Sequence, residues 1–112
     1  LYNWDRMKQT GYAWWVARLR RLLHQCDAVR LDHFRGFAAA WHIPAGEKDA
    51  TRGKWVPGPG KDLFDRLAAA LGPLPVVAED LGLITDDVHE LRKAAGLPGM
   101  RVLQFALTGP DN

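Results

Sequence analysis

The sequence predicts an α/β fold in which helices alternate with short buried strands. Two apolar runs of strand length, Ala28–Leu31 and Pro75–Ala78, are bounded by polar or glycine-containing segments. The segments before and after these runs carry apolar side chains at helical spacing. Strands that alternate with helices favour parallel pairing through right-handed crossovers, so we expect the two strands to lie in one sheet.

The amino-terminal half contains one predicted helix, one predicted strand and one long connection. Apolar residues recur at helical spacing over Tyr12–Leu23, with Arg18 and Arg21 on the other side of the helix. Ala28–Leu31 follows as a short strand. Residues Phe34–Gly60 form a connection rich in Gly, Pro and Trp that is longer than most loops in compact domains. Its aromatic side chains predict a packed segment rather than a disordered one.

The carboxyl-terminal half continues the alternation. The predicted elements are a helix over Asp62–Leu71, a strand over Pro75–Ala78, a helix that begins at the N-cap Thr85 and ends at Gly96, and a third strand over Met100–Leu107. Three strands cannot close a barrel and leave two unpaired sheet edges. We therefore interpret residues 1–112 as part of one larger domain, shortened at both ends. A doubly wound open sheet remains an alternative, although no glycine-rich nucleotide-binding pattern supports it.

Composition excludes several classes of partner. Of the 112 residues 47% are hydrophobic and 25% are charged, as in ordinary globular proteins, and the net charge is only +2. Scattered basic residues argue against nucleic-acid binding, and no apolar run approaches membrane-spanning length. Cys26 is the only cysteine and is expected to be a small buried side chain. The lack of disulfides favours a reducing compartment, so we expect a cytoplasmic location.

A carboxylate follows each of the first two strands: Asp32 after Ala28–Leu31, and Glu79 after Pro75–Ala78. Acids beside an apolar core are costly unless they are paired or functional. Neighbouring parallel strands lie roughly 4.8 Å apart, and retaining glycosidases hold their two carboxyl groups about 5 Å apart. Acids at matching heights on adjacent strands can therefore supply a nucleophile and an acid/base. The pattern suggests a barrel enzyme that acts on sugars.

The neighbours of the two acids favour different roles. Arg30 lies on the same side of its strand as Asp32, and its positive charge keeps a nucleophilic carboxylate ionised and oriented. From the Arg-x-Asp spacing alone, a structural ion pair is the better interpretation. Apolar residues before Glu79 disfavour a charged carboxylate, which suits a general acid. Asp80 beside it competes for that role, and we choose Glu79 for its longer side chain.

Other side chains near the first acid could contact a sugar. His33 directly follows the candidate nucleophile and could donate a hydrogen bond to a hydroxyl group, although a lone histidine is more often structural. The other three histidines show no metal-ligand spacing, so we predict no catalytic metal. Flat rings can stack on sugars or pack the long connection, and packing is the preferred interpretation for Trp55. The rings concerned are those of Phe34, Phe37, Trp41 and Trp55.

These residues lie in blocks that resemble a known family. The chain is similar to the 4-alpha-glucanotransferases of glycoside hydrolase family 77, the amylomaltases or disproportionating enzymes of the alpha-amylase clan. The similarity runs over almost the whole chain. The matching blocks are Leu1–Asp5, Gly11–Trp15, Val29–Phe37, Trp41–Ala45, Gly53–Val56, Ala78–Gly82 and Gly96–Ala106.

The resemblance implies a fold, a reaction and a set of roles. The fold is an open part of a (β/α)8 TIM barrel, with residues 1–112 supplying roughly the fourth to sixth strands of its catalytic domain. The implied reaction moves a segment of an α-1,4-glucan to the 4-hydroxyl of another glucan or glucose by a retaining double displacement. Asp32 is the implied nucleophile and Glu79 the implied acid/base, while Arg30 and His33 contact substrate.

The resemblance also sets expectations about partners. It implies no cofactor, and it implies α-1,4-glucans, maltooligosaccharides and the rest of the barrel as partners. The family's third essential carboxylate lies in a motif that this sequence does not contain, so we expect the chain by itself to be inactive. An α-glucan hydrolase of the same clan and a non-catalytic glucan-binding barrel are the alternatives.

Overall fold

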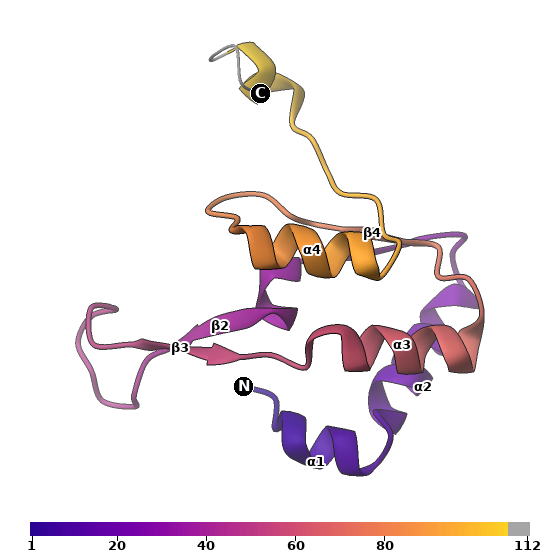
Figure 1. The fold of residues 1–112 in the computed structure, drawn as a ribbon, viewed down its shortest axis with the longest axis horizontal. Helices are drawn as coiled ribbons and strands as arrows, with labels where there is room; N and C mark the ends of the chain where they lie inside the picture. The colour runs from indigo at the N-terminus through magenta and orange to yellow at the C-terminus, as the bar shows by residue number, and fades with distance from the viewer. Residues whose placement is uncertain (108–112) are drawn as a thin grey trace.

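The computed structural model describes residues 1–107 (Figure 1). In these residues the helices are α1 (Trp4–Gln9), α2 (Ala13–Leu23), α3 (Gly60–Leu71) and α4 (Asp86–Ala94), with 3-10 helices η1 (Phe34–Phe37) and η2 (Leu103–Leu107). The strands are β1 (Val29–Leu31), β2 (Ala39–His42), β3 (Lys54–Pro57) and β4 (Val76–Ala78). The predicted helices at Tyr12–Leu23, Asp62–Leu71 and after Thr85 are confirmed to within two residues.

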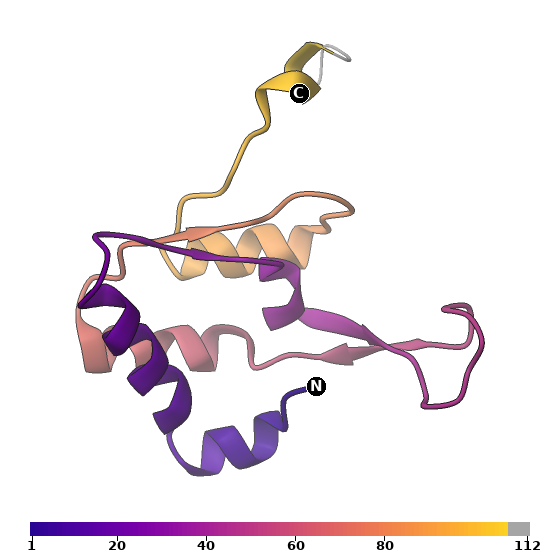
Figure 2. The ribbon, with the colours of Figure 1, turned by 180° about the vertical axis from the view of Figure 1, so that it is seen from behind.

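The two predicted strands pair in parallel, as expected. Val29 lies opposite Val76, and Leu31 lies opposite Ala78. Figure 2 shows the two strands running side by side. The chain leaves β1, passes through α3 and returns as β4, which gives a strand–helix–strand unit whose two strand ends face the same way. Because both strands begin and end on buried residues, the sheet is fixed against the core by its terminal side chains.

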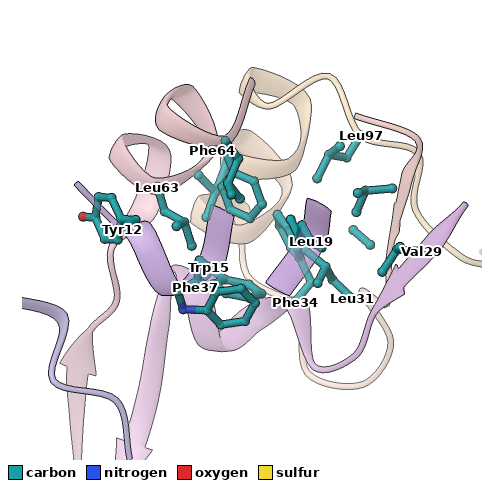
Figure 3. Close-up of a cluster of buried hydrophobic side chains, with 14 of the residues drawn as sticks. Tyr12, Trp15, Leu19, Val29, Leu31, Phe34, Phe37, Leu63, Phe64 and Leu97 are labelled. Atoms are coloured by element: carbon teal, nitrogen blue, oxygen red, sulfur yellow. The ribbon is translucent and has the colours of Figure 1, made fainter. Parts of the chain in front are cut away.

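One apolar core holds these elements together (Figure 3). Helix α2 contributes Trp15 and Leu19 to it, and α3 contributes Phe64. Phe34 and Phe37 of η1 lie among them, with the Phe37 ring centroid 5.3 Å from that of Phe64. Aromatic rings at such separations contribute dispersion and edge-to-face attraction beyond their buried area. The turn that follows β1 is thus fixed to the helices by its own phenylalanines.

The long connection predicted over Phe34–Gly60 contains an antiparallel hairpin of β2 and β3. Ala39 lies opposite Pro57 and His42 opposite Lys54. The hairpin projects from the body of the molecule (Figure 1). Its base is tight, because a Cβ added to Gly58 would lie 2.4 Å from the Phe37 carbonyl oxygen. The connection is therefore packed at its base, as predicted, but it is more regular than a loop.

The predicted third strand over Met100–Leu107 is wrong. Residues 100–102 form no regular element, and η2 follows them. The chain runs beside β4 for one hydrogen bond, in which the Ala78 amide donates to the Pro98 carbonyl at 2.9 Å. The Met100 amide then donates to Asp80 Oδ1 instead of to a strand. No other described strand pairs with this segment, and it extends away from the body in Figure 1.

Two smaller expectations also change. Cys26 is exposed just beyond α2, with its Sγ atom 3.2 Å from the Leu22 carbonyl oxygen, because the whole connection of residues 24–28 lies at the surface. Thr85 occupies the N-cap position of α4, but its hydroxyl donates to the Asp87 carboxylate and does not cap the helix backbone. Over residues 1–107, no helix is both long and apolar enough to cross a membrane.

Candidate active site

The candidate acids leave the paired strands at the same height. Leu31 and Ala78 are register partners, so Asp32 and Glu79 are the next residues on the two strands. Two backbone hydrogen bonds tie their exits together. The Glu79 amide donates to the Leu31 carbonyl at 2.9 Å, and the Phe34 amide donates to the Glu79 carbonyl at 2.9 Å. The matching heights expected from the sequence are therefore present in the sheet.

Asp32 is open to solvent and paired with the predicted arginine. Its side chain is 76% exposed, and the Arg30 guanidinium donates to Asp32 Oδ1. Both residues project from the same side of β1, as side-chain alternation requires. An exposed ion pair contributes little to folding stability because water screens it. The pair therefore orients the carboxylate more than it stabilises the fold.

Glu79 is half-buried and held by backbone donors. The His33 amide donates to Glu79 Oε2 at 2.7 Å, and the Leu81 amide donates to Oε1 at 3.1 Å. His33 has left-handed backbone angles, with φ 50° and ψ 53°, which is uncommon for a residue other than glycine. The residue after one candidate acid thus contacts the side chain of the other through its main chain.

Asp80 turns the other way, into the fold. It is 5% exposed, its Oδ2 atom lies 3.0 Å from Arg92 Nε, and its Oδ1 atom accepts the Met100 amide at 2.8 Å. Gly99 makes room for it, since a Cβ there would lie 2.4 Å from Asp80 Oδ2. The two successive acids after β4 therefore have different environments: Glu79 lies at the carboxyl end of the sheet, and Asp80 lies inside the fold.

A cavity of about 420 Å³ lies beside the end of β1. Arg30, Asp32 and His33 line it, together with the aromatic residues Tyr2 and Trp4. Sequence reasoning assigned no role to either aromatic residue, although both lie in a block that supports the family resemblance. Glu79 is not part of the cavity lining. The structure therefore brings Arg30, Asp32 and His33 to one cavity and connects Glu79 to them through the His33 backbone.

The candidate sugar-stacking rings divide into two groups. Phe34 and Phe37 are both buried in the core, and of the two only Phe37 lines the cavity beside Asp32. Trp41 and Trp55 lie on the hairpin, 39% and 52% exposed, with ring centroids 5.5 Å apart. The Arg35 guanidinium lies 4.3 Å from the Trp55 ring centroid. Trp55 thus packs less closely than expected, and it packs against a charged side chain.

The candidate site is built from acids, an arginine and a histidine, so its side chains were compared with the ligand set of a metal ion. Among residues 1–107, no group of three or more His, Cys, Asp or Glu side chains could hold a metal ion. What the site offers is two carboxylates in different environments, one arginine and one histidine at the carboxyl ends of parallel strands. The fold and the site define a segment of an α/β protein that presents its polar residues where barrel enzymes place theirs.

Comparison with known proteins identifies the family. The family model described as 4-alpha-glucanotransferase, glycoside hydrolase family 77, matches residues 1–112, and the chain belongs to this family. It is 50% identical over 111 residues to a 4-alpha-glucanotransferase of Streptococcus pneumoniae, covering 99% of this chain. It is 52% identical over 109 residues to the chloroplastic/amyloplastic 4-alpha-glucanotransferase of Arabidopsis thaliana, covering 97% of this chain.

A solved structure agrees with the sequence comparisons. The fold matches the amylomaltase from Streptococcus agalactiae in complex with acarbose, with a TM-score of 0.89 and 38% identity over 94% of this chain. The chain spans 22% of the Streptococcus pneumoniae enzyme, 19% of the Arabidopsis thaliana enzyme and 21% of the solved amylomaltase chain. The similarity thus concerns about a fifth of each of these proteins.

Proposed function

We propose that this chain is part of the catalytic barrel of a 4-alpha-glucanotransferase, which moves segments of α-1,4-glucans from a donor glucan to an acceptor. The observation that carries the proposal is the matched exit of Asp32 and Glu79 from the paired strands β1 and β4. Family membership adds the reaction class. In this proposal the chain supplies roughly the fourth to sixth barrel strands and their loops, and the remaining segments of the enzyme complete the domain.

In the first step, Asp32 attacks the anomeric carbon of a bound glucan. The bond from that carbon to the glycosidic oxygen breaks, and Glu79 gives its proton to the departing oxygen. The product is a covalent glycosyl ester on Asp32. The exposed, arginine-paired carboxylate of Asp32 suits the nucleophile, since attack requires an ionised group with an open approach.

In the second step, the 4-hydroxyl of an acceptor glucan attacks the same carbon. Glu79, now ionised, takes the hydroxyl proton, and the ester bond to Asp32 breaks. The amides of His33 and Leu81 donate to the carboxylate of Glu79, which holds the ionised side chain in place for this step. Asp80 is unsuited to either role because it is buried against Arg92.

Arg30 and His33 are the proposed substrate-contacting residues. Both line the cavity beside Asp32, and both side chains are polar groups that can bond to sugar hydroxyls. Tyr2 and Trp4 add flat rings to the same cavity. Acceptors and donors are then α-1,4-glucans and maltooligosaccharides. The amylomaltase of Streptococcus agalactiae was solved in complex with acarbose, which supports an oligosaccharide as the ligand of the enzyme that carries this segment. A cytoplasmic location stays a prediction.

Product analysis of the full-length protein that carries this segment tests the proposal. Incubated with maltotriose, it should give glucose and a ladder of longer maltooligosaccharides, and its Asp32→Asn variant should give neither. Short sugars without longer products would identify a hydrolase and overturn transfer as the function. Glucan binding without any turnover would identify a non-catalytic module.

A further inference from the structure

Arg35, which follows the turn after β1, contacts both the loop after β4 and the hairpin of β2 and β3. It lies on η1, directly after the turn that contains Asp32 and His33. Its Nη1 atom donates to the Leu83 carbonyl at 3.1 Å and to the Thr85 hydroxyl at 2.9 Å. Its guanidinium carbon lies 4.3 Å from the ring centroid of Trp55 on β3. One side chain therefore connects the loop after β1, the loop after β4 and the hairpin.

The Arg35 side chain is partly shielded from water, although its partners Leu83, Thr85 and Trp55 lie at the surface. Arg35 is half-buried, and its Nε atom is buried without a hydrogen-bond partner among the described residues. Leaving a buried donor unpaired is unfavourable, so the remaining contacts must hold the guanidinium in this position. A cation over an indole ring is attracted by the ring face, and this attraction is retained at exposed sites such as Trp55. The planar guanidinium can also stack on the ring while it donates in its own plane, which a lysine cannot do.

The segment that Arg35 holds begins beside Glu79. The Leu81 amide donates to Glu79 Oε1, and Leu83 and Thr85 follow two and four residues later. At its other end the same segment leads into α4, where the Thr85 hydroxyl donates to the Asp87 carboxylate. Fixing Leu83 and Thr85 therefore limits how far the Leu81 amide, and with it the Glu79 carboxylate, can move.

We propose that Arg35 is a positioning residue that holds the loop after Glu79 against the loop after Asp32 and anchors the hairpin through Trp55. This inference rests on the proposed function for the roles of the two acids. Arg35 does not line the cavity beside Asp32, so it acts through other residues and not on the substrate. The expected signature is a loss of kcat with little change in KM, because misplacing a reacting group slows the chemical step without removing binding contacts.

Hydrogen exchange on the full-length enzyme tests the mechanical part. Arg35→Met should speed amide exchange both in residues 81–85 and in the hairpin. Arg52→Met is the matched control, since Arg52 is an exposed hairpin arginine whose nearest carboxylate is 3.8 Å away. It should leave residues 81–85 unchanged. Equal exchange in residues 81–85 of the Arg35→Met variant and the wild type would overturn the proposal, whether or not the enzyme transfers glucan.

Kinetics on maltotriose test the catalytic part. Arg35→Met should lower kcat by about 10²-fold with KM within a few-fold of wild type. Arg35→Lys should recover part of this loss, because it keeps the charge but not the planar fork. Arg52→Met should retain wild-type kcat. Unchanged kcat in Arg35→Met would overturn the positioning role. A wild-type enzyme without transfer activity would contradict the proposed function instead, and hydrogen exchange would still decide the contacts of Arg35.

A double-mutant cycle distinguishes a positioning role of Arg35 from a general loss of stability in the Arg35 variant. Thr85→Val removes one acceptor for Arg35 at a position outside the core. If Arg35 acts through Thr85, the kcat loss of the double variant should be smaller than the product of the single losses. Independent losses, together with a melting temperature lowered in proportion, would show a general structural role and contradict the proposal.

Discussion

The loops after β1 and β4 start at the same height but hold their acids in opposite ways. Asp32 is exposed and paired with another side chain, Arg30. Glu79 is half-buried and held by main-chain amides, one of them from the β1 loop itself. The carboxyl ends of β1 and β4 therefore provide one carboxylate that is open to solvent and one whose orientation is fixed by hydrogen bonds. Two groups of the same chemical type can take different roles when only their surroundings differ.

The comparison predicts the largest effect at the exposed acid. Asp32→Asn keeps the shape of the side chain but removes the proposed nucleophile, so turnover of maltotriose should fall by more than about 10⁴-fold. Stability should change little, because the ion pair with Arg30 is exposed. Steady-state kinetics and calorimetric glucan binding on the full-length protein check this. Turnover above a hundredth of the wild-type rate would assign the nucleophile to another residue.

The fixed acid should give a smaller effect that depends on the substrate. Glu79→Gln removes a transferable proton, and general acid–base groups typically contribute 10²–10⁴-fold to the rate. With an activated aryl glucoside donor the first step needs little proton transfer, so the loss in that step should shrink strongly. Pre-steady-state release of the aryl group measures it. A loss of equal size on both donors would argue against the acid role of Glu79.

Asp80, the acid next to Glu79, should affect the stability of the fold and not the reaction. Asp80 is buried with Arg92, and removing one partner of a buried ion pair leaves an uncompensated charge. Asp80→Asn should therefore lower the free energy of unfolding by about 3 kcal/mol. Denaturant unfolding measures the change, and kcat per folded molecule should remain near wild type. A variant with normal stability and lost turnover would reverse the assignment between Glu79 and Asp80.

The smallest predicted effect concerns acid pH and the β4 loop. The Thr85 hydroxyl, more than the nearby Arg35 charge, holds the pKa of Asp87 below its ordinary value. A lowered carboxyl pKa adds stability above the unfolded pKa and loses it as the pH falls through the folded one. Thr85→Val should thus cost less than about 1 kcal/mol at pH 7, since Asp87 is exposed. Melting temperatures should show a smaller difference below about pH 4. A difference that does not shrink there would contradict this origin.

Local patterns were sufficient to predict the elements that carry the two acids. β1 and β4 are short apolar runs with clear boundaries, and their parallel pairing follows from the helix between them. That pairing alone placed Asp32 and Glu79 at matching heights. The ion pair between Arg30 and Asp32 follows from side-chain alternation along one strand. These predictions succeed because each depends on spacing along the chain or on one pairing rule.

The errors concern contacts between distant segments. Met100–Leu107 has the apolar content of a strand, but a strand also needs a neighbour, and Asp80 takes the Met100 amide instead. Arg35 lies in Val29–Phe37, one of the blocks that carry the family resemblance, yet its partners at Leu83 and Thr85 are 48 and 50 residues away. No local pattern indicates which loop a long side chain will reach. The hairpin was not predicted because residues 43–53 separate β2 from β3, so no short turn indicates that the two strands pair.

The left-handed backbone at His33 limits how this surface can vary through evolution or engineering. A side chain branched at Cβ is strongly disfavoured in that conformation, so valine, isoleucine or threonine at position 33 would be selected against. Asparagine, aspartate and glycine are the natural substitutes. Libraries that aim to alter the cavity beside Asp32 should therefore sample these three residues at position 33. Bulkier branched diversity belongs at positions whose backbone is extended or helical.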